Sequence, residues 1–268
     1  MDIINPLTQD WVKVKAAVFD FDGTLSTLRY GWESVMEPFM IEAIEGDTPA
    51  DDELVKEVRN YIDESTGIQT IFQMQWLVEA IKRYRRNPEV KDDPWWYKNE
   101  YNKRLMISVN KRKQSILSGR KSPKDYLIRG SEAFLNRLKG NGVEIYVASG
   151  TDFPDVLNEV EVLKLKKYFK EIKGAPLGVA ACSKEAVLKK LVEDNKLKGQ
   201  EVVVVGDGKV EINLGNQIGA KTIGVASNEE KLYGVNPVKE KRLIKAGANI
   251  IVGDFTNIEG IIGWLNLK

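Results

Sequence analysis

A short apolar run near the start of the chain ends abruptly in two aspartates. The run Ala16 to Phe19 is followed by Asp20 and Asp22, with one residue between them, and then by Gly23. A strand places alternate side chains on one face, so both carboxylates are expected to point the same way where the strand ends and the glycine lets the backbone turn. Two carboxylates this close resist joint ionisation unless a cation lies between them, which predicts a divalent metal held by oxygen ligands. The alternative is a plain acidic turn after a buried strand, although such a turn requires only one aspartate.

The composition describes a globular protein with a substantial core. The chain has 268 residues, of which 43% are hydrophobic and 29% charged. Because single domains usually hold about 100 to 150 residues, one large domain or a core with an insertion is expected. No apolar stretch reaches the roughly 18 residues of a membrane span, and the first residues do not resemble a secretory signal. We therefore expect a cytoplasmic protein with no membrane partner.

The absence of histidine excludes several kinds of active site. Histidine general bases, Ser-His-Asp triads and zinc sites with histidine ligands are ruled out. Acid–base chemistry must then come from carboxylates, lysine, tyrosine or the single thiol. That thiol, Cys182, can form no internal disulfide, which suits a reducing compartment, and it is interpreted as a small core or loop residue.

Strand and helix patterns alternate at both ends of the chain. Trp11 to Phe19 is predicted to be the first strand. After Pro123, strands are predicted at 143–148, near 172, and at 202–205, 222–226 and 250–252, with helices at 131–138, 155–169, 186–191 and within 232–245. Repeated βα units with continuously apolar strands predict an α/β fold, a Rossmann-like doubly wound parallel sheet. Since ligands bind at the carboxyl ends of such strands, Asp20, Ser149 and Asp207 are expected to converge.

Residues 26–123 instead show helical periodicity with no strong strand candidate. Helices are predicted at 31–44, 51–62, 70–84 and 94–117, the third capped by Thr70 and the fourth either continuous or broken. A stretch of this length is large enough for a small domain. The domain prediction is therefore an α/β core over 1–25 and 124–268, with an inserted all-helical cap domain over 26–123.

Four separated motifs carry a family resemblance. They are Asp20-Phe21-Asp22-Gly23-Thr24-Leu25, Ser149-Gly150-Thr151, Lys184, and Gly206-Asp207-Gly208 with Glu211. In this order they resemble the haloacid dehalogenase (HAD) superfamily, specifically its aspartate-nucleophile phosphatases with a helical cap inserted after the first strand. The resemblance covers nearly the whole chain. Glu211 departs from it, because many members have aspartate there.

The resemblance implies roles for these residues. Asp20 would be the nucleophile that forms an aspartyl phosphate, and Asp22 the general acid and base. An aspartate at position 22 favours phosphoryl transfer over dehalogenation, since a departing halide needs no proton. Ser149, the backbone at Gly150 and Lys184 would hold the phosphoryl oxygens. Taken alone, Ser149 also fits a polar strand-end turn, and Lys184 a solvated surface lysine.

The implied cofactor is Mg²⁺, which prefers oxygen ligands and commonly bridges carboxylate and phosphate. The resemblance assigns it to Asp20, Asp22 through its backbone carbonyl, and Asp207, with Glu211 acting through water. The predicted function is a Mg²⁺-dependent phosphatase that hydrolyses a small phosphate monoester, such as a sugar phosphate or a phosphoglycolate-like acid. A phosphomutase on a sugar phosphate, and a non-catalytic phosphate-ligand or nucleic-acid-binding protein, are the alternatives.

The insertion is expected to select the substrate, because a cap over the site excludes water and contacts the non-reacting part of the ester. The candidates for these contacts are Tyr30, Trp32, Gln69, Thr70, Gln73 and the aromatic run 95–97. Gln69 and Thr70, in a short polar turn between helices, are the preferred specificity residues. A plain helix start capped by Thr70 explains them equally well.

The insertion also carries a basic stretch. Residues 81–124 include 14 lysines and arginines against 4 acidic residues. Such a stretch attracts anionic substrates or nucleic acid, but a solvated helical face is the simpler interpretation, so no nucleic-acid partner is expected.

Overall fold

A seven-stranded sheet forms the centre of the protein, which a computed structural model describes over residues 1–4, 12–88, 90–180 and 183–267. Its spatial order is β1-β7-β6-β5-β2-β3-β4. The strands are β1 (Asp2–Ile3), β2 (Ala16–Phe19), β3 (Glu144–Asp152), β4 (Glu171–Ala175), β5 (Val202–Gly206), β6 (Lys221–Val225) and β7 (Ile250–Val252). Edge strand β1 pairs antiparallel with β7, while the other neighbouring pairs are parallel. The predicted doubly wound parallel sheet is confirmed, and β1 is an addition to it.

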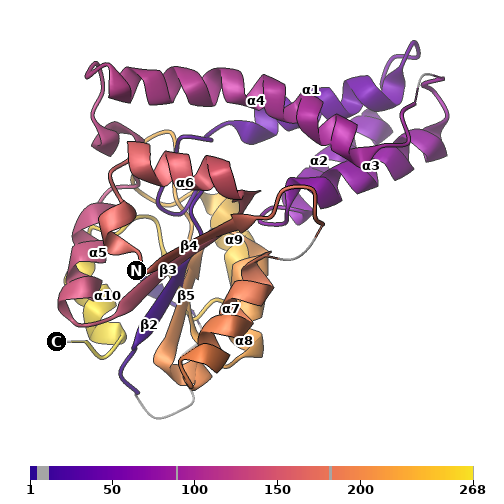
Figure 1. Ribbon diagram of the computed structural model, residues 1–268. Helices are drawn as coiled ribbons and strands as arrows, with labels where there is room; N and C mark the ends of the chain where they lie inside the picture. The colour runs from indigo at the N-terminus through magenta and orange to yellow at the C-terminus, as the bar shows by residue number, and fades with distance from the viewer. Residues whose placement is uncertain (5–11, 89, 181–182, 268) are drawn as a thin grey trace.

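Alternate residues of the central strand β2 supply two different hydrophobic clusters. Ala17 and Phe19 belong to one cluster, and Ala16 and Val18 to another. A strand buried on both faces must be apolar throughout, which explains the continuous apolar run. Helices α5 (Ser131–Gly140) and α10 (Ile258–Trp264) cover the first face, and α7 (Ser183–Asp194) and α8 (Lys209–Gln217) the second (Figure 1). Helix α9 (Pro237–Lys245) continues the second layer beside α8.

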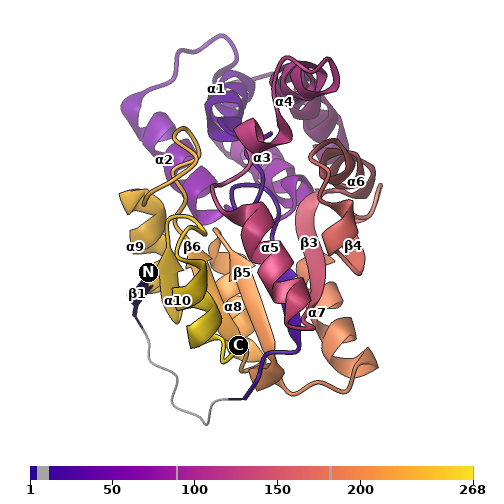
Figure 2. The ribbon, with the colours of Figure 1, turned by 90° about the vertical axis from the view of Figure 1, so that its left-hand side faces the viewer.

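The insertion that follows β2 is a helical cap. It consists of α1 (Trp32–Glu45), α2 (Asp52–Glu64), α3 (Thr70–Tyr84) and α4 (Pro94–Leu117). These helices share a hydrophobic cluster of their own, separate from the clusters of the sheet. They lie together beyond the carboxyl ends of the central strands (Figures 1 and 2), and the chain returns to the core through the 3₁₀ turn η1 (Pro123–Tyr126). The predicted α/β core with an inserted helical cap is confirmed as the fold class.

Two strand predictions differ from the structure. Strand β2 begins at Ala16, whereas the prediction began at Trp11, which lies outside the described residues. Strand β3 does not end at Ala148 but continues to Asp152. Asp152 still pairs with Ala175 of β4, after a shift in register between Ala148 and Asp152. This pairing keeps the chain extended beyond the last residue of the apolar pattern.

Two helix predictions also differ. The helix expected over 155–169 is α6 (Phe153–Val162), because Lys164 adopts a left-handed φ of 58° and only the 3₁₀ turn η2 (Lys166–Tyr168) follows. Thr70 does not cap α3. The cap position belongs to Gln69, whose side chain makes no capping hydrogen bond, and Thr70 is the first helical residue.

In the part of the chain that the structure describes, six of the 14 basic residues of the stretch are paired with acidic side chains. Five of these pairs lie within the cap: Lys82 with Asp92, Arg83 with Glu57, Arg86 with Asp51, Lys103 with Glu100, and Arg104 with Glu42. The sixth is buried and joins Lys98 to Asp152 at the end of β3. This pairing supports the interpretation of the stretch as a solvated helical face. Among the described helices, none combines the length and the apolar character that crossing a membrane requires.

Candidate active site

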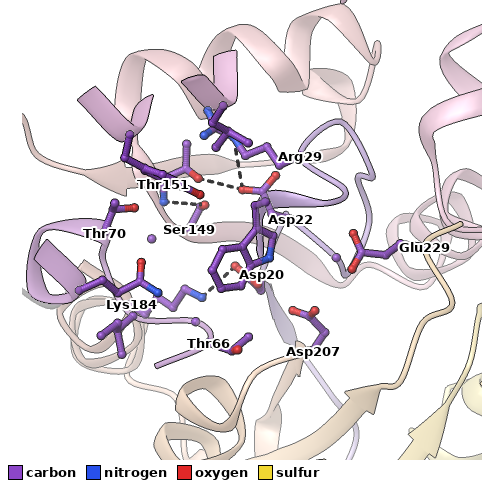
Figure 3. A pocket seen from close by; sticks show the side chains of 18 residues that line it. Asp20, Asp22, Arg29, Thr66, Thr70, Ser149, Thr151, Lys184, Asp207 and Glu229 are labelled. Atoms are coloured by element: carbon purple, nitrogen blue, oxygen red, sulfur yellow. Dashed lines mark hydrogen bonds and ion pairs between the residues drawn. The ribbon is translucent and has the colours of Figure 1, made fainter. Parts of the chain in front are cut away.

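A cavity of about 100 Å³ lies between the carboxyl ends of the central strands and the cap (Figure 3). The core and the chain leading to the cap contribute Asp20, Asp22, Gly23, Arg29, Ser149, Gly150, Thr151, Lys184, Asp207 and Glu229. The cap contributes Trp32, Thr66, Gly67, Ile68, Thr70, Gln73, Tyr101 and Leu105. The structure therefore brings together the residues that the sequence placed at three distant strand ends.

Lys184 joins two carboxylates at the floor of this cavity. Its Nζ lies 2.9 Å from Asp20 Oδ1 and also donates a hydrogen bond to Glu211 Oε1. All three side chains are buried, so Lys184 is not a solvated surface lysine. Burial raises the pKa of Asp20 well above its ordinary value, the charges of Glu211, Asp207 and Asp22 raise it further, and Lys184 opposes them. The ammonium thus compensates much of the charge that the strand end brings together.

Asp22 lies in a second polar network, toward α6. Its Oδ2 accepts a hydrogen bond of 2.9 Å from Thr151 Oγ1 and lies 3.9 Å from Arg29 Nε. Its Oδ1 is buried and has no hydrogen-bond partner among the described residues. Burial, with the nearby charge of Glu159, raises the pKa of Asp22 to about 7 against the opposing effects of Arg29 and Thr151. Near neutral pH this carboxyl can therefore both give and take a proton.

Arg29 is a site residue that the sequence analysis missed. Its guanidinium donates to Glu159 through Nη2 at 2.7 Å and Nε at 3.1 Å, and it lies 3.5 Å from Asp155. Glu159, on α6, is fully buried by this pairing. The one signal in the sequence was an arginine four residues after the motif that ends at Leu25. Its partner lies 130 positions away, so only the folded chain shows why the arginine is there.

Asp207 is paired with a second lysine that the sequence analysis also missed. Lys239 Nζ, from α9, lies 2.6 Å from Asp207 Oδ2 and 2.6 Å from Glu229 Oε1, and it donates to Ser227 Oγ at 3.2 Å. Burial alone would raise the pKa of Asp207, but Lys239 and the other nearby cations hold it below its ordinary value. In the sequence Lys239 is one of several lysines of an exposed-looking helix, and nothing marks it as buried.

The donor set of the cavity fits a divalent cation. Asp20 and Asp207 line the same small space, and each has one carboxylate oxygen that its lysine does not engage. A Cβ at position 23 would clash with the Asp207 carboxylate, so glycine allows the backbone that follows Asp22 to approach it. Within the described residues, no three acidic side chains are grouped closely enough to hold an ion by themselves. The carboxylates of Asp20 and Asp207 are therefore the side chains that could hold such a cation, while Glu211 pairs with Lys184.

The cap turn at 65–69 packs directly onto the core at this site. A Cβ added to Gly150 would lie 3.0 Å from the carbonyl oxygen of Ile68, and one added to Gly67 would lie 3.1 Å from Glu211 Oε1. Gly67 also has a φ of 92°, which other residues rarely adopt. Both glycines therefore permit a close approach between the cap and the core.

The candidate specificity residues of the cap separate into two groups. Thr70 lines the cavity. Gln69 does not line it: this residue precedes α3 and is buried elsewhere in the structure. Gln73 contributes instead, because residues three apart share one face of a helix and Thr70 lies on that face. Of the other cap candidates, Trp32 also lines the cavity, whereas Tyr30 and the run 95–97 do not.

Comparison with known proteins identifies the family. The model of the family described as haloacid dehalogenase-like hydrolase matches residues 14–219. The chain therefore belongs to the haloacid dehalogenase-like hydrolases, and the prediction of a hydrolase of this superfamily is confirmed. Among curated proteins, none matches the chain significantly.

Solved structures share the fold at low sequence identity. A predicted phosphoglycolate phosphatase from Haemophilus somnus 129pt is 17% identical with a TM-score of 0.63, over 94% of this chain and 99% of that one. A β-phosphoglucomutase from Clostridium difficile is 17% identical with a TM-score of 0.62, over 94% and 97%. A predicted phosphatase from Clostridium acetobutylicum is 19% identical with a TM-score of 0.59, over 94% and 100%. At these identities the likeness concerns the fold.

Arg242 on α9 ties the cap turn to the core. Its Nη1 donates to Asp63 Oδ1 at 2.8 Å and to Thr66 Oγ1 at 3.3 Å, both in the cap. Its Nη2 donates to the carbonyl oxygen of Asp207 at 3.2 Å. One guanidinium therefore holds the cap turn against the segment that carries Asp207.

Removing this link should loosen the turn without unfolding the protein. In Arg242→Met, we expect backbone amides of residues 65–69 to exchange hydrogen at least about ten times faster, because hydrogen bonds to charged groups contribute about 1.5 to 3 kcal/mol. Lys245→Met, at an exposed position of the same helix, is the matched control. Hydrogen exchange followed by mass spectrometry measures both. Equal exchange in the two variants would mean that other contacts hold the turn.

Proposed function

We propose that this hydrolase removes the phosphoryl group from a small phosphate monoester through an aspartyl phosphate formed on Asp20, with Mg²⁺ as cofactor. The observation that carries the proposal is the convergence of Asp20, Asp22, Lys184 and Asp207 in one small cavity. A volume of about 100 Å³ beneath the cap supports a small substrate. The fold shared with phosphatases and a phosphomutase agrees with this chemistry.

In the first half-reaction, a carboxylate oxygen of Asp20 attacks phosphorus, and the bond between phosphorus and the ester oxygen breaks. Asp22 gives its proton to the departing alkoxide, which leaves as the alcohol. The transferred group spreads negative charge over its equatorial oxygens. The Lys184 ammonium, the Ser149 hydroxyl and the backbone N–H at Gly150 are the proposed stabilisers of that charge.

In the second half-reaction, water attacks the phosphorus of the aspartyl phosphate. Asp22, now a carboxylate, takes the proton of that water, and inorganic phosphate leaves as Asp20 is regenerated. The position of Asp22 supports both roles, because its buried Oδ1 has no hydrogen-bond partner among the described residues and its Oδ2 is fixed by Thr151. The cap turn over the cavity would keep other water away during the first step.

Asp20, Asp207 and the backbone carbonyl of Asp22 would hold the Mg²⁺, with Glu211 a further candidate through water. When bound, the ion would neutralise charge on the carboxylates and on the phosphoryl oxygens.

The main alternative is a phosphomutase, in which Asp20 passes the phosphoryl group to a second sugar hydroxyl instead of water. Release of inorganic phosphate distinguishes the two reactions. Membership of a hydrolase family opposes the other alternative, a non-catalytic protein that binds a phosphate ligand or nucleic acid.

Loss of the nucleophile should abolish turnover. Asp20→Asn is nearly isosteric but cannot attack phosphorus effectively, so we expect kcat to fall by roughly 10⁴-fold while the protein remains folded. Asp194→Asn, at an exposed position on α7, should retain wild-type turnover. Phosphate release and circular dichroism measure the two properties. Substantial turnover by pure Asp20→Asn would remove Asp20 from this role.

Loss of the proposed acid should depend on the leaving group. Asp22→Asn should lower kcat/KM for an alkyl phosphate about 100-fold more than for p-nitrophenyl phosphate, because only the alkoxide needs a proton on departure. Steady-state kinetics on both esters with the wild-type and variant enzymes measures the ratio. Similar losses on the two esters would show that Asp22 does not protonate the leaving group.

Activity should also depend on a divalent metal. Chelation should remove turnover and added Mg²⁺ should restore it, while Asp207→Ala should raise the half-saturating Mg²⁺ concentration at least about ten-fold. A titration of rate against Mg²⁺ measures this dependence. Full turnover in excess chelator would contradict the metal assignment and leave the covalent chemistry of Asp20 to be judged separately.

A further inference from the structure

The cations that reach the cavity are already opposed by carboxylates. Arg29 is bonded to Glu159 and lies near Asp155 and Asp22. Lys184 is paired with Asp20 and Glu211. Among the described residues that line the cavity, Arg29 and Lys184 are the cations, so neither wall offers an uncompensated positive charge.

The acids of the cavity outnumber these cations. Asp20, Asp22, Asp207 and Glu229 line it, and Lys239 is shared between Asp207 and Glu229 from behind the wall. A Mg²⁺ ion at Asp20 and Asp207 would be balanced by the dianionic phosphoryl group of the substrate. No positive charge in the described wall then remains for a second anionic group.

The cap side of the cavity is uncharged. Trp32, Tyr101 and Leu105 present aromatic and apolar surface, and Thr70 and Gln73 present a hydroxyl and an amide. Gln73 Nε2 donates to Ser65 Oγ at 3.1 Å, which fixes its amide beside the cap turn. Such a wall suits a group with hydroxyls and carbon faces. A carboxylate placed there would meet Arg29, which already pairs with Glu159 and lies near Asp22, and burial of a charge without its own counter-charge is costly.

We infer that the leaving group of the substrate is a neutral hydroxylated alcohol, a sugar or a polyol, and that the cavity discriminates against esters with a carboxylate or a second phosphate. This inference rests on the proposed phosphatase function and narrows it. It separates sugar phosphates from phosphoglycolate-like acids, which the sequence left together. The carboxylates of the cavity repel a second anionic group, and no unpaired cation is present to bind it. Specificity often depends on such unfavourable contacts with the wrong ligand.

Two matched pairs of esters test the inference. 2-Hydroxyethyl phosphate and phosphoglycolate differ only in a hydroxymethyl group against a carboxylate, and so do glycerol 3-phosphate and 3-phosphoglycerate. With Mg²⁺ present, we expect kcat/KM to be at least about ten-fold higher for the neutral member of each pair, because like-charge juxtaposition is strongly unfavourable. An equal or higher value for the carboxylate esters would overturn the inference.

The design separates failure of this inference from failure of the proposed function. Turnover of p-nitrophenyl phosphate tests the function, whatever the leaving-group preference. The affinity of each pair for the wild-type enzyme with Mg²⁺ tests the preference separately, measured as inhibition of p-nitrophenyl phosphate turnover or, if no ester is turned over, by calorimetry. Tighter binding of the neutral esters supports the inference, and equal or tighter binding of the carboxylate esters refutes it in either case.

A charge introduced into the cap wall provides the matched variants. Thr70 lines the cavity and is half-buried at the start of α3, so Thr70→Lys adds a cation there. We expect the preference for 2-hydroxyethyl phosphate over phosphoglycolate to fall about ten-fold in Thr70→Lys and to change much less in the uncharged Thr70→Gln. Equal shifts in the two variants would attribute the preference to shape and overturn the charge argument.

Discussion

The crowding of carboxylates at the carboxyl ends of β2 and β5 is the constraint on which the rest of this structure depends. Asp20 and Asp207 are buried beside each other, and buried charges are tolerated only when they are paired. Lys184 and Lys239, each from a different helix of the core, supply that pairing. The packing of α7 and α9 against the sheet is thus coupled to the electrostatics of the site.

The cap extends the same constraint across the cavity. Its turn approaches the core at Gly150 and Glu211, and Arg242 bonds both to the turn and to the backbone of Asp207. Arg29 plays a related part at the other wall, where it bridges Glu159 on α6 and Asp22. Because charged groups of core and cap satisfy one another, closure of the cap and order within the site are expected to depend on each other.

The sequence was most informative where neighbouring residues alone decide the secondary structure. The continuously apolar run before Asp20 requires a strand buried on both faces, and β2 has that environment. It was least informative at element ends. The register shift that extends β3, and the left-handed Lys164 that stops α6, depend on partners that local periodicity does not encode. Cys182, interpreted as a core or loop residue, lies outside the described part of the chain.

By itself the sequence determined the α/β class, the place of the helical insertion and the strand-end positions of Asp20, Asp22 and Asp207, because alternation, apolar runs and motif order are local properties of a chain. Ser149, expected just after a strand, lies inside β3. Only the tertiary structure decided which long-range partners complete the site. Arg29 and Lys239 carry no motif, and nothing in the sequence separates Gln73, which lines the cavity, from Gln69, which does not. Their roles follow from which side chains the packed helices bring within bonding distance, and that distance is set by the whole core rather than by neighbours in sequence.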